Sequence, residues 1–235
     1  MSNTSFTFKQ FTVNHDKCAM KVGTDGVLLG AWAPVANAKQ ILDVGTGTGL
    51  IALQLAQRNQ LATVTAIEID PSAAVQAKEN VQGSPWADRI KVVCSDFREF
   101  QSEVKFDLIV SNPPYFIDAL KCPDEQRNIA RHTGGLNYEL LFRHAAHLLG
   151  EEGLVSVIIP VEAEKAVVDA AWNNRLFPLN RLRVITKPGK NCRRVLFTFS
   201  FQNKECIEES LCIEIERNNY TPEYIALTKE FYLKM

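Results

Sequence analysis

Apolar runs typical of strands alternate with segments of helical spacing, and this alternation constrains the fold of the 235-residue chain more than any other feature. The strand-like runs lie at residues 40–47, 62–70, 89–97, 105–115 and 153–160. The helix-like segments lie at residues 50–58, 71–81, 138–149 and 161–174. Strands that alternate with helices predict an α/β fold with a doubly wound, mostly parallel sheet.

The C-terminal part of the chain has a different pattern. Residues 179–186 and 193–201 are strand-like, and the turn-rich residues between them predict a hairpin. Residues 210–216 could add a further strand. Residues 221–233 predict a closing helix, with Thr221 at its N-cap and Pro222 at its first position.

A glycine-rich turn follows the first of the alternating strands. The ligands of open parallel sheets bind beyond the carboxyl ends of the strands, and this end reads Asp43-Val44-Gly45-Thr46-Gly47-Thr48-Gly49. Glycines let the backbone pass close to a ligand. The spacing G-x-G-x-G differs from the dinucleotide pattern G-x-G-x-x-G. Glycines alone would indicate only a tight turn, but the acidic residues near them favour a ligand site.

Two carboxylates define the ligand expected at this turn. Asp43 could accept a hydrogen bond from an ammonium group or a water. Glu68 closes the second strand, where an acidic side chain binds ribose hydroxyls. Together they suit a nucleoside with a cationic, amino-acid-like end.

The third strand ends at Asp96 and Phe97, which have two interpretations. Asp96 could accept a hydrogen bond from an adenine amino group while Phe97 covers the ring. Alternatively, Asp96 caps a helix.

The fourth strand ends in Asn112-Pro113-Pro114-Tyr115, beside the same crevice. Prolines fix φ and donate no backbone hydrogen bond, so they form a rigid turn. An exocyclic amino group on a base is a poor nucleophile because its lone pair is delocalised into the ring. The Asn112 side-chain oxygen and the Pro113 carbonyl could hold both N–H bonds and free that lone pair, while Tyr115 stacks on the ring. The alternative is a structural turn with a surface tyrosine.

The order DVGTGTG, IEID, SDF, NPPY resembles the class I S-adenosylmethionine-dependent amino-methyltransferases. A closer resemblance, outside these motifs, is to the bacterial tRNA1(Val) adenine-N6 methyltransferases, which modify the adenine just 3′ of the anticodon. It is carried by residues 6–13, 16–35, 84–90 and 224–233.

This resemblance implies a Rossmann-like, seven-stranded sheet with one antiparallel strand, and methylation of adenine 37 by S-adenosylmethionine. It also implies that residues 21–32 pack beside the glycine turn. The cofactor-binding residues expected on these grounds are Lys21, Gly23, Thr24, Asp43, Gly45, Gly47, Gly49, Glu68, Asp96, Phe97 and Asn112. The expected catalytic residues are Asn112, Pro113, Pro114 and Tyr115.

Contacts with the anticodon loop of tRNA are expected from basic residues of two segments. The loop after the NPPY motif offers Arg127 and Arg131, whereas His132 suits binding or packing better than general base catalysis. The hairpin offers Arg181, Arg183, Lys187, Lys190, Arg193 and Arg194, with no acidic residue among them. Such a ridge suits phosphates. The alternative is a solvated edge that protects exposed strands. The acidic residues 205–216 should face away from RNA.

Three other functions share parts of this pattern. Enzymes that methylate a glutamine amide in release factors carry the same NPPY motif but add an N-terminal helical domain, for which about forty residues are too few. DNA adenine methylation usually needs a separate target-recognition region. A non-catalytic RNA-binding subunit with the same fold is the remaining alternative, and the intact motifs argue against it.

Composition limits the setting in which the protein works. The net charge of -1 excludes a global polycation, so nucleic-acid binding needs a local patch. No membrane-spanning run and no signal peptide are evident. Six cysteines without a Cys-x-x-Cys pair favour reduced thiols in a cytoplasmic protein, with no metal. We expect one domain over residues 1–235, with an N-terminal cap segment (1–40), a cofactor and catalytic core (41–160) and a C-terminal part with the basic hairpin (161–235).

Overall fold

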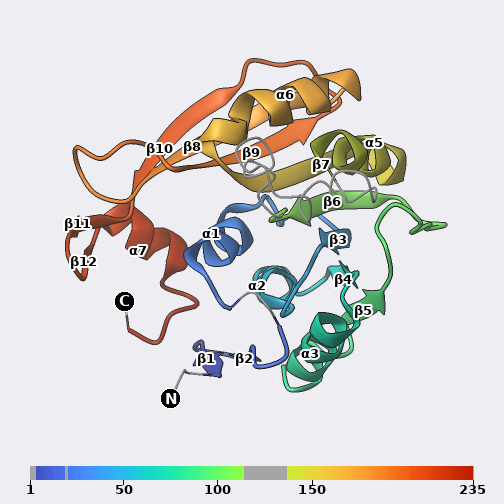
Figure 1. Ribbon diagram of the computed structural model, residues 1–235, viewed down its shortest axis with the longest axis horizontal. Helices are drawn as coiled ribbons and strands as arrows, with labels where there is room; N and C mark the ends of the chain where they lie inside the picture. The colour runs from blue at the N-terminus through green and yellow to red at the C-terminus, as the bar shows by residue number, and fades with distance from the viewer. Residues whose placement is uncertain (1–3, 19–20, 114–136, 235) are drawn as a thin grey trace, which may run out of the picture.

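A computed structural model describes residues 4–18, 21–113 and 137–234 of the chain, and it is organised around one large twisted sheet (Figure 1). The strands of this sheet are, in spatial order, β10 (Ile207–Cys212), β8 (Phe177–Ile185), β9 (Arg194–Ser200), β7 (Leu149–Pro160), β6 (Phe106–Ser111), β3 (Gln40–Val44), β4 (Thr63–Glu68) and β5 (Ile90–Cys94). Every neighbouring pair is parallel except the two pairs that contain β9. The α/β fold and the β8–β9 hairpin predicted from the sequence are confirmed.

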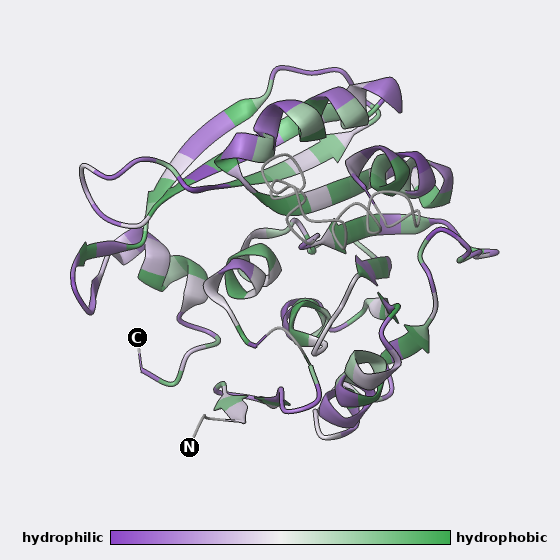
Figure 2. Cartoon of the chain, in the orientation of Figure 1, coloured by the Kyte–Doolittle hydropathy of each residue, from purple (hydrophilic) through white to green (hydrophobic). Residues whose placement is uncertain are grey.

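Helices cover both faces of the sheet. They are α1 (Thr24–Trp32), α2 (Leu50–Arg58), α3 (Pro71–Gln82), α5 (Tyr138–Leu148), the 3-10 helix η2 (Val161–Ala163), α6 (Glu164–Asn173) and α7 (Pro222–Thr228). Buried residues of α1, α2, α3 and α7 pack on one face, and those of α5 and α6 on the other. Helices α3, α5 and α6 carry a mixture of hydrophobic and hydrophilic residues, whereas the central strands are mostly hydrophobic (Figure 2). None of the described helices is long and apolar enough to cross a membrane.

Among the described residues, the large sheet has eight strands rather than the seven that the family resemblance implied. The additional strand is β10, which pairs in parallel with β8 over six residue positions. An acidic strand can lie against the basic β8 because Glu208 stands directly opposite Arg181 and forms an ion pair with it. The expected single antiparallel strand is β9.

The carboxyl ends of the central strands meet at one edge of the sheet. Val44 at the end of β3 is level with Ile67 on β4 and with Ser111 at the end of β6. The Ser111 hydroxyl donates a hydrogen bond of 2.9 Å to the Val44 carbonyl, which joins the two strand ends. The glycine turn and Asn112 therefore start from adjacent points.

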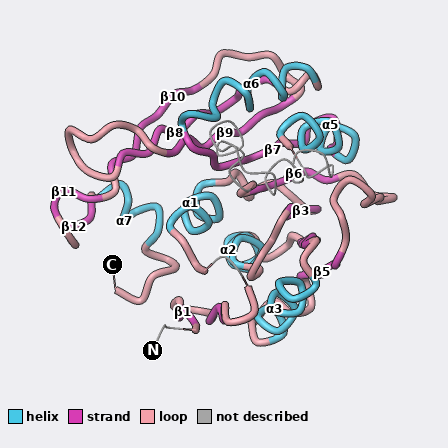
Figure 3. The backbone as a smooth tube through the Cα atoms, in the orientation of Figure 1, coloured by secondary structure: helices cyan, strands magenta, loops and turns pink. Residues whose placement is uncertain are grey.

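The N-terminal segment begins with a small hairpin of β1 (Ser5–Thr7) and β2 (Thr12–Asn14), and a second ribbon of β11 (Glu214–Glu216) and β12 (Asn219–Tyr220) precedes α7 (Figure 3). The Lys9 amide donates to the Phe231 carbonyl at 2.7 Å, so the two ends of the chain lie together. Thr221 caps α7, as predicted, because its hydroxyl accepts from the Tyr224 amide.

Four of the described cysteines are free thiols, in line with the prediction of reduced cysteines: Cys94, Cys192, Cys206 and Cys212.

Candidate active site

The glycine turn after β3 is built from left-handed backbone. Gly45, Gly47 and Gly49 have φ of 71°, 56° and 85°, a region that side chains with a Cβ rarely adopt. The amides of Gly45 and Thr46 both donate to the Ile67 carbonyl at 2.9 Å, which fixes the turn on β4. A Cβ on Gly45 would meet no described atom within 4 Å, so open space lies over the backbone there.

Glu68 supports this turn with its carboxylate. One oxygen accepts from the Gly47 amide at 2.8 Å, and the other accepts from the Asp70 amide at 3.0 Å. The residue is 9% exposed. A carboxylate has about four acceptor positions, so Glu68 keeps capacity for ribose hydroxyls while it holds the turn.

Asp43 lies beneath the turn and is fully buried. Its Oδ2 accepts from the Thr46 hydroxyl at 2.6 Å and from the Ala52 amide at 3.1 Å. Its Oδ1 has no hydrogen-bond partner among the described residues. Burial raises the pKa of Asp43 to about 7, because desolvation disfavours the charged form more than the two hydrogen bonds favour it.

Two supporting residues were not singled out in the sequence. The buried Asn80 of α3 donates to the Thr48 carbonyl and pairs with the backbone of Asn14, so it joins the glycine turn to β2.

The second residue, Ile69, follows Glu68 directly and is 62% exposed. An exposed apolar side chain of this size beside Glu68 is large enough to cover a purine ring, and its exposure is evident only from the folded structure.

Asp96 and Phe97, which follow β5, make contacts within the protein that explain their positions without an adenine ligand. Asp96 accepts from the Arg98 backbone amide at 2.9 Å and from the Arg98 side chain, which lowers the pKa of Asp96. Phe97 is buried and packs edge-on against His144 at a centroid distance of 4.8 Å. Residues 97–99 form a turn and not a helix, so the prediction that Asp96 caps a helix is wrong. The hydrogen bonds and the ion pair with Arg98 nevertheless occupy much of Asp96, and its adenine role stays a prediction.

Asn112 follows β6 directly and is half-buried, and Pro113 is buried. Both therefore start from the strand end that Ser111 joins to β3. Pro114, Tyr115, Arg127, Arg131 and His132 lie outside the described residues.

The segment that precedes α1 lies close to the glycine turn, as the resemblance implied. Lys21, Gly23 and Thr24 are exposed, and Gly23 is the N-cap of α1. A Cβ on Gly26 would stand 3.0 Å from Leu50, the first residue after the glycine turn. The closeness of α1 and α2 thus depends on Gly26.

Most basic side chains of the β8–β9 hairpin form ion pairs within the chain. Arg181 and Arg183 bind Glu164 at 2.7 and 2.9 Å, and Arg181 also binds Glu208. Lys187 binds Glu214 at 3.2 Å, and Arg194 binds Asp25 of α1 at 2.8 Å. The acidic segment predicted to face away from RNA thus neutralises part of the basic hairpin. No ion pair to a described residue forms at Lys190 or Arg193.

The described residues fit an S-adenosylmethionine ligand at this edge of the sheet. Gly45 leaves open space above the turn, and Asp43 presents an unpaired buried oxygen near it. Glu68 and the exposed Ile69 stand at the end of the neighbouring strand β4. There Glu68 could accept hydrogen bonds from a ribose, and Ile69 could pack on a purine. In the described parts of the chain, no group of three or more His, Cys, Asp or Glu could hold a metal ion.

The comparisons with known sequences agree over the full chain. The family model of the methyltransferase small domain matches residues 22–166. A tRNA1(Val) (adenine(37)-N6)-methyltransferase of Bacteroides fragilis is 56% identical over 238 residues, which cover 100% of each chain. A protein of the same name from Tolumonas auensis is 48% identical over 236 residues, covering 100% of this chain and 99% of the relative.

Solved structures share the fold at low identity. A predicted O-methyltransferase from Agrobacterium tumefaciens superposes with a TM-score of 0.70 at 20% identity, over 88% of this chain and 96% of that one. A putative RNA methyltransferase from Pyrococcus horikoshii gives 0.53 at 20% identity, over 74% and 80%. At these identities the likeness concerns the fold alone.

Proposed function

This chain belongs to the methyltransferase small domain family and, within it, to the tRNA1(Val) (adenine(37)-N6)-methyltransferases, and on that premise we propose that it methylates the N6 amino group of adenine 37 in tRNA1(Val). The cofactor is S-adenosylmethionine, which supplies a methyl group on a sulfonium sulfur. The partner is tRNA, contacted at its anticodon loop, and neither a membrane nor a metal takes part. The setting we propose is the cytoplasm, and the whole of residues 1–235 acts as one unit.

The observation that carries the proposal is the register of β3 and β6. Val44 and Ser111 are level and joined by a hydrogen bond, so the glycine turn and Asn112 leave the sheet side by side. A cofactor over the glycines and a base at Asn112 would then meet at one edge. Positioning of two reactants in this way supplies a large part of the rate of a transfer reaction.

Asn112 and Pro113 carry the chemistry in this proposal. Their side-chain and backbone oxygens accept the two N–H bonds of the exocyclic amino group and turn its lone pair out of the base plane. Pro114 keeps the turn rigid, and Tyr115 stacks on the base. A strong general base is not needed, because the proton is lost readily once the nitrogen carries a positive charge.

Two groups of residues hold the cofactor in this proposal: the glycine turn with its neighbouring carboxyl groups, and the N-terminal segment. Gly45, Gly47 and Gly49 let the backbone approach it, and Glu68 binds its ribose. Asp43 faces its ammonium end through the oxygen that has no other partner among the described residues. Lys21, Gly23 and Thr24 close the site from the N-terminal segment.

The test is methyl transfer to a defined RNA. The purified protein is incubated with methyl-labelled S-adenosylmethionine and unmodified tRNA1(Val), with a transcript carrying guanine at position 37 as the matched control. We expect labelled N6-methyladenosine in the first RNA and none in the control. Label on a different nucleoside would overturn the base assignment. Label in a protein glutamine, with none in RNA, would replace the proposal by release-factor methylation.

A further inference from the structure

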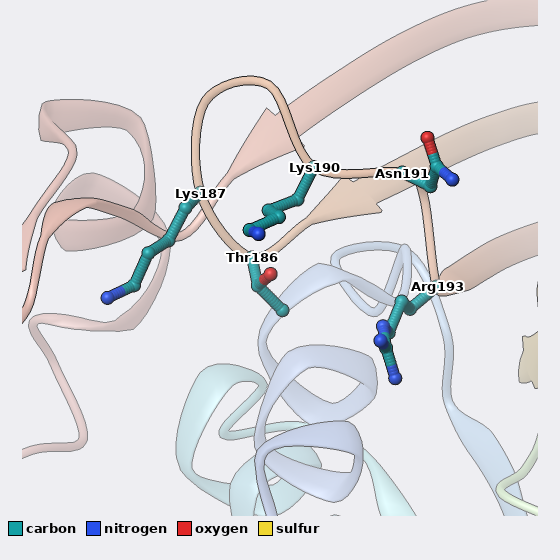
Figure 4. Close-up of a pocket in the computed structure, with 5 residues that line it drawn as sticks. All are labelled: Thr186, Lys187, Lys190, Asn191 and Arg193. Carbon is teal, nitrogen blue, oxygen red and sulfur yellow. The ribbon is translucent and has the colours of Figure 1, made fainter.

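The loop between β8 and β9 encloses a cavity of about 550 Å³. Its lining residues are Thr186, Lys187, Lys190, Asn191 and Arg193 (Figure 4). Figure 4 shows Lys190 crossing the inside of the loop beside Thr186, Arg193 extending from the opposite arm, and Lys187 directed away from both. The residues that line it carry ammonium, guanidinium, hydroxyl and amide groups on one short loop, and the aliphatic parts of their side chains form most of the cavity wall.

The charges of this cavity differ from those on the strands of the same hairpin. Arg181, Arg183 and Arg194 each bind a carboxylate within the chain. Lys190 and Arg193 are exposed, and neither forms an ion pair with a described residue. Two positively charged residues of the cavity lining are therefore without an ion-pair partner in the described parts of the chain.

The cavity lies at the sheet edge that carries the proposed active site. Ser111 at the end of β6 is level with Val157 on β7, and Pro160 at the end of β7 pairs with Arg194. The start of β9 is thus two strands away from β6 and three residues further out. With about 4.8 Å between strands and about 3.3 Å per residue, Ser111 at the end of β6 and Arg194 at the start of β9 are roughly 14 Å apart. A few nucleotides of single strand can span this distance.

We propose that this loop cavity binds a backbone phosphate of the substrate RNA, next to the nucleotide whose base enters at Asn112. Arg193 and Lys190 supply the charge, and Thr186 and Asn191 supply neutral hydrogen-bond donors to the same phosphate. The ion-paired residues of β8 and the start of β9 hold the hairpin in place and do not contact RNA. The proposal rests on the proposed function. Of the six basic residues of the hairpin, it assigns RNA contact to two, Lys190 and Arg193.

The test compares two double variants with the same change of charge. The first is Lys190→Gln with Arg193→Gln. The control is Lys91→Gln with Lys204→Gln, because Lys91 is exposed on the far edge strand β5 and Lys204 lies beyond the opposite end of β9. Binding to an anticodon stem-loop is measured over a series of salt concentrations with S-adenosylhomocysteine present, so the readout does not depend on turnover.

We expect the cavity variant to bind RNA about tenfold more weakly, with the slope of log Kd against log salt reduced by about 0.7, since each phosphate contact to a single strand contributes about that much. The control variant should bind like the wild type, and both variants should bind cofactor normally. Equal RNA affinity and salt slope in both variants, with a wild type that methylates tRNA, would overturn this proposal and leave the proposed function standing.

Two further outcomes would also overturn it. If inorganic phosphate raises the Tm of the wild type but not of the cavity variant, while their RNA affinities are equal, the cavity is a site for a free anion. If the wild type methylates protein and not RNA, the proposed function fails, and this proposal fails with it.

Discussion

Around the glycine turn, the carboxylates of Asp43 and Glu68 accept hydrogen bonds from nearby backbone amides, whereas on the β8–β9 hairpin the basic side chains are held by carboxylates from distant segments. The partners of Asp43 lie three and nine residues away along the chain. Arg194, by contrast, binds Asp25 across 169 residues, and Arg181 binds Glu208 across 27. Both regions use buried or half-buried charge, but the turn joins carboxyl groups mainly to backbone amides, whereas the hairpin joins charged side chains to one another. In sequence, the contact between Glu68 and the Gly47 amide spans 21 residues.

This difference bears on how each region can work. Charge-assisted hydrogen bonds from the Gly47 and Asp70 amides to the Glu68 carboxylate leave the turn little freedom, so the cofactor side is pre-formed before a ligand arrives. The ion pairs of the hairpin are partly exposed and individually weak, and their role is to place the loop. The largest effects should thus come from the strand ends and the smallest from the hairpin.

Asn112→Ala tests the end of β6, the strand that lies in the sheet between β3 and the hairpin. We expect kcat to fall by about 10³-fold, because loss of one positioned hydrogen-bonding group from a reacting centre typically costs this much. Cofactor affinity should stay nearly normal, since the glycine turn and Glu68 are untouched. Labelled methyl transfer gives kcat, and calorimetry with S-adenosylhomocysteine gives the affinity. Near-normal turnover would show that the amino-group mechanism is wrong.

Asp43→Asn tests whether the stability of the protein depends on pH through the buried carboxyl group beneath the glycine turn. Burial raises the pKa of Asp43 from 3.8 to about 7, so the folded protein holds a proton there that the unfolded chain releases above pH 4. This contribution to stability is complete below pH 4 and is lost as the pH rises through 7.

The amide that Asp43→Asn introduces would resemble the protonated acid at every pH. We therefore expect the difference in unfolding free energy, wild type minus variant, to fall by on the order of 4 kcal/mol between pH 4 and pH 8, at about 1.36 kcal/mol for each pKa unit. Denaturant melts at several pH values measure this difference, in which other titrating groups cancel. A difference that is constant with pH would contradict the buried, protonated Asp43.

Glu68→Ala and Glu68→Gln separate two functions of one carboxylate. Alanine removes the acceptors of both the Gly47 and the Asp70 amides, whereas glutamine keeps one acceptor. We expect alanine to weaken cofactor binding about 100-fold and to lower the unfolding free energy by about 2 kcal/mol, with glutamine between it and the wild type. Chemical denaturation and cofactor titration report the two effects. Asp70→Ala, which removes only the cap of α3, is the control. Unchanged cofactor affinity in Glu68→Ala would exclude the ribose contact.

The contrast between the two regions also explains what the sequence could predict. The alternation of strands and helices predicted the sheet, and the G-x-G-x-G spacing with Asp43 and Glu68 located the turn. These signals are readable because each side chain and its partner are close in sequence or tied to a strand end. Asn80 escaped notice because its partners, Asn14 and Thr48, become neighbours only in the folded chain.

The hairpin was harder to interpret for the same reason. Its six basic residues were predicted as one ridge, because the sequence did not show which strand would lie beside β8. The parallel pairing of β10 brings Glu208 opposite Arg181, which also adds the eighth strand. A local count of charges therefore did not show which of them are paired within the chain.

The Arg194–Asp25 pair should give the smallest effect, and it tests whether the hairpin is placed by such pairs. The Arg194 Nε stands 2.8 Å from the Asp25 carboxylate, with both side chains partly exposed. A double-mutant cycle with Arg194→Gln and Asp25→Asn should give a coupling free energy of about 0.5 kcal/mol in denaturant melts. Neither single variant should change the salt slope of RNA binding, because Arg194 is already paired within the chain. A slope reduced by Arg194→Gln as much as by Arg193→Gln would mean that the ion pair opens to bind RNA, and the division of the hairpin into paired and free charges would then fail.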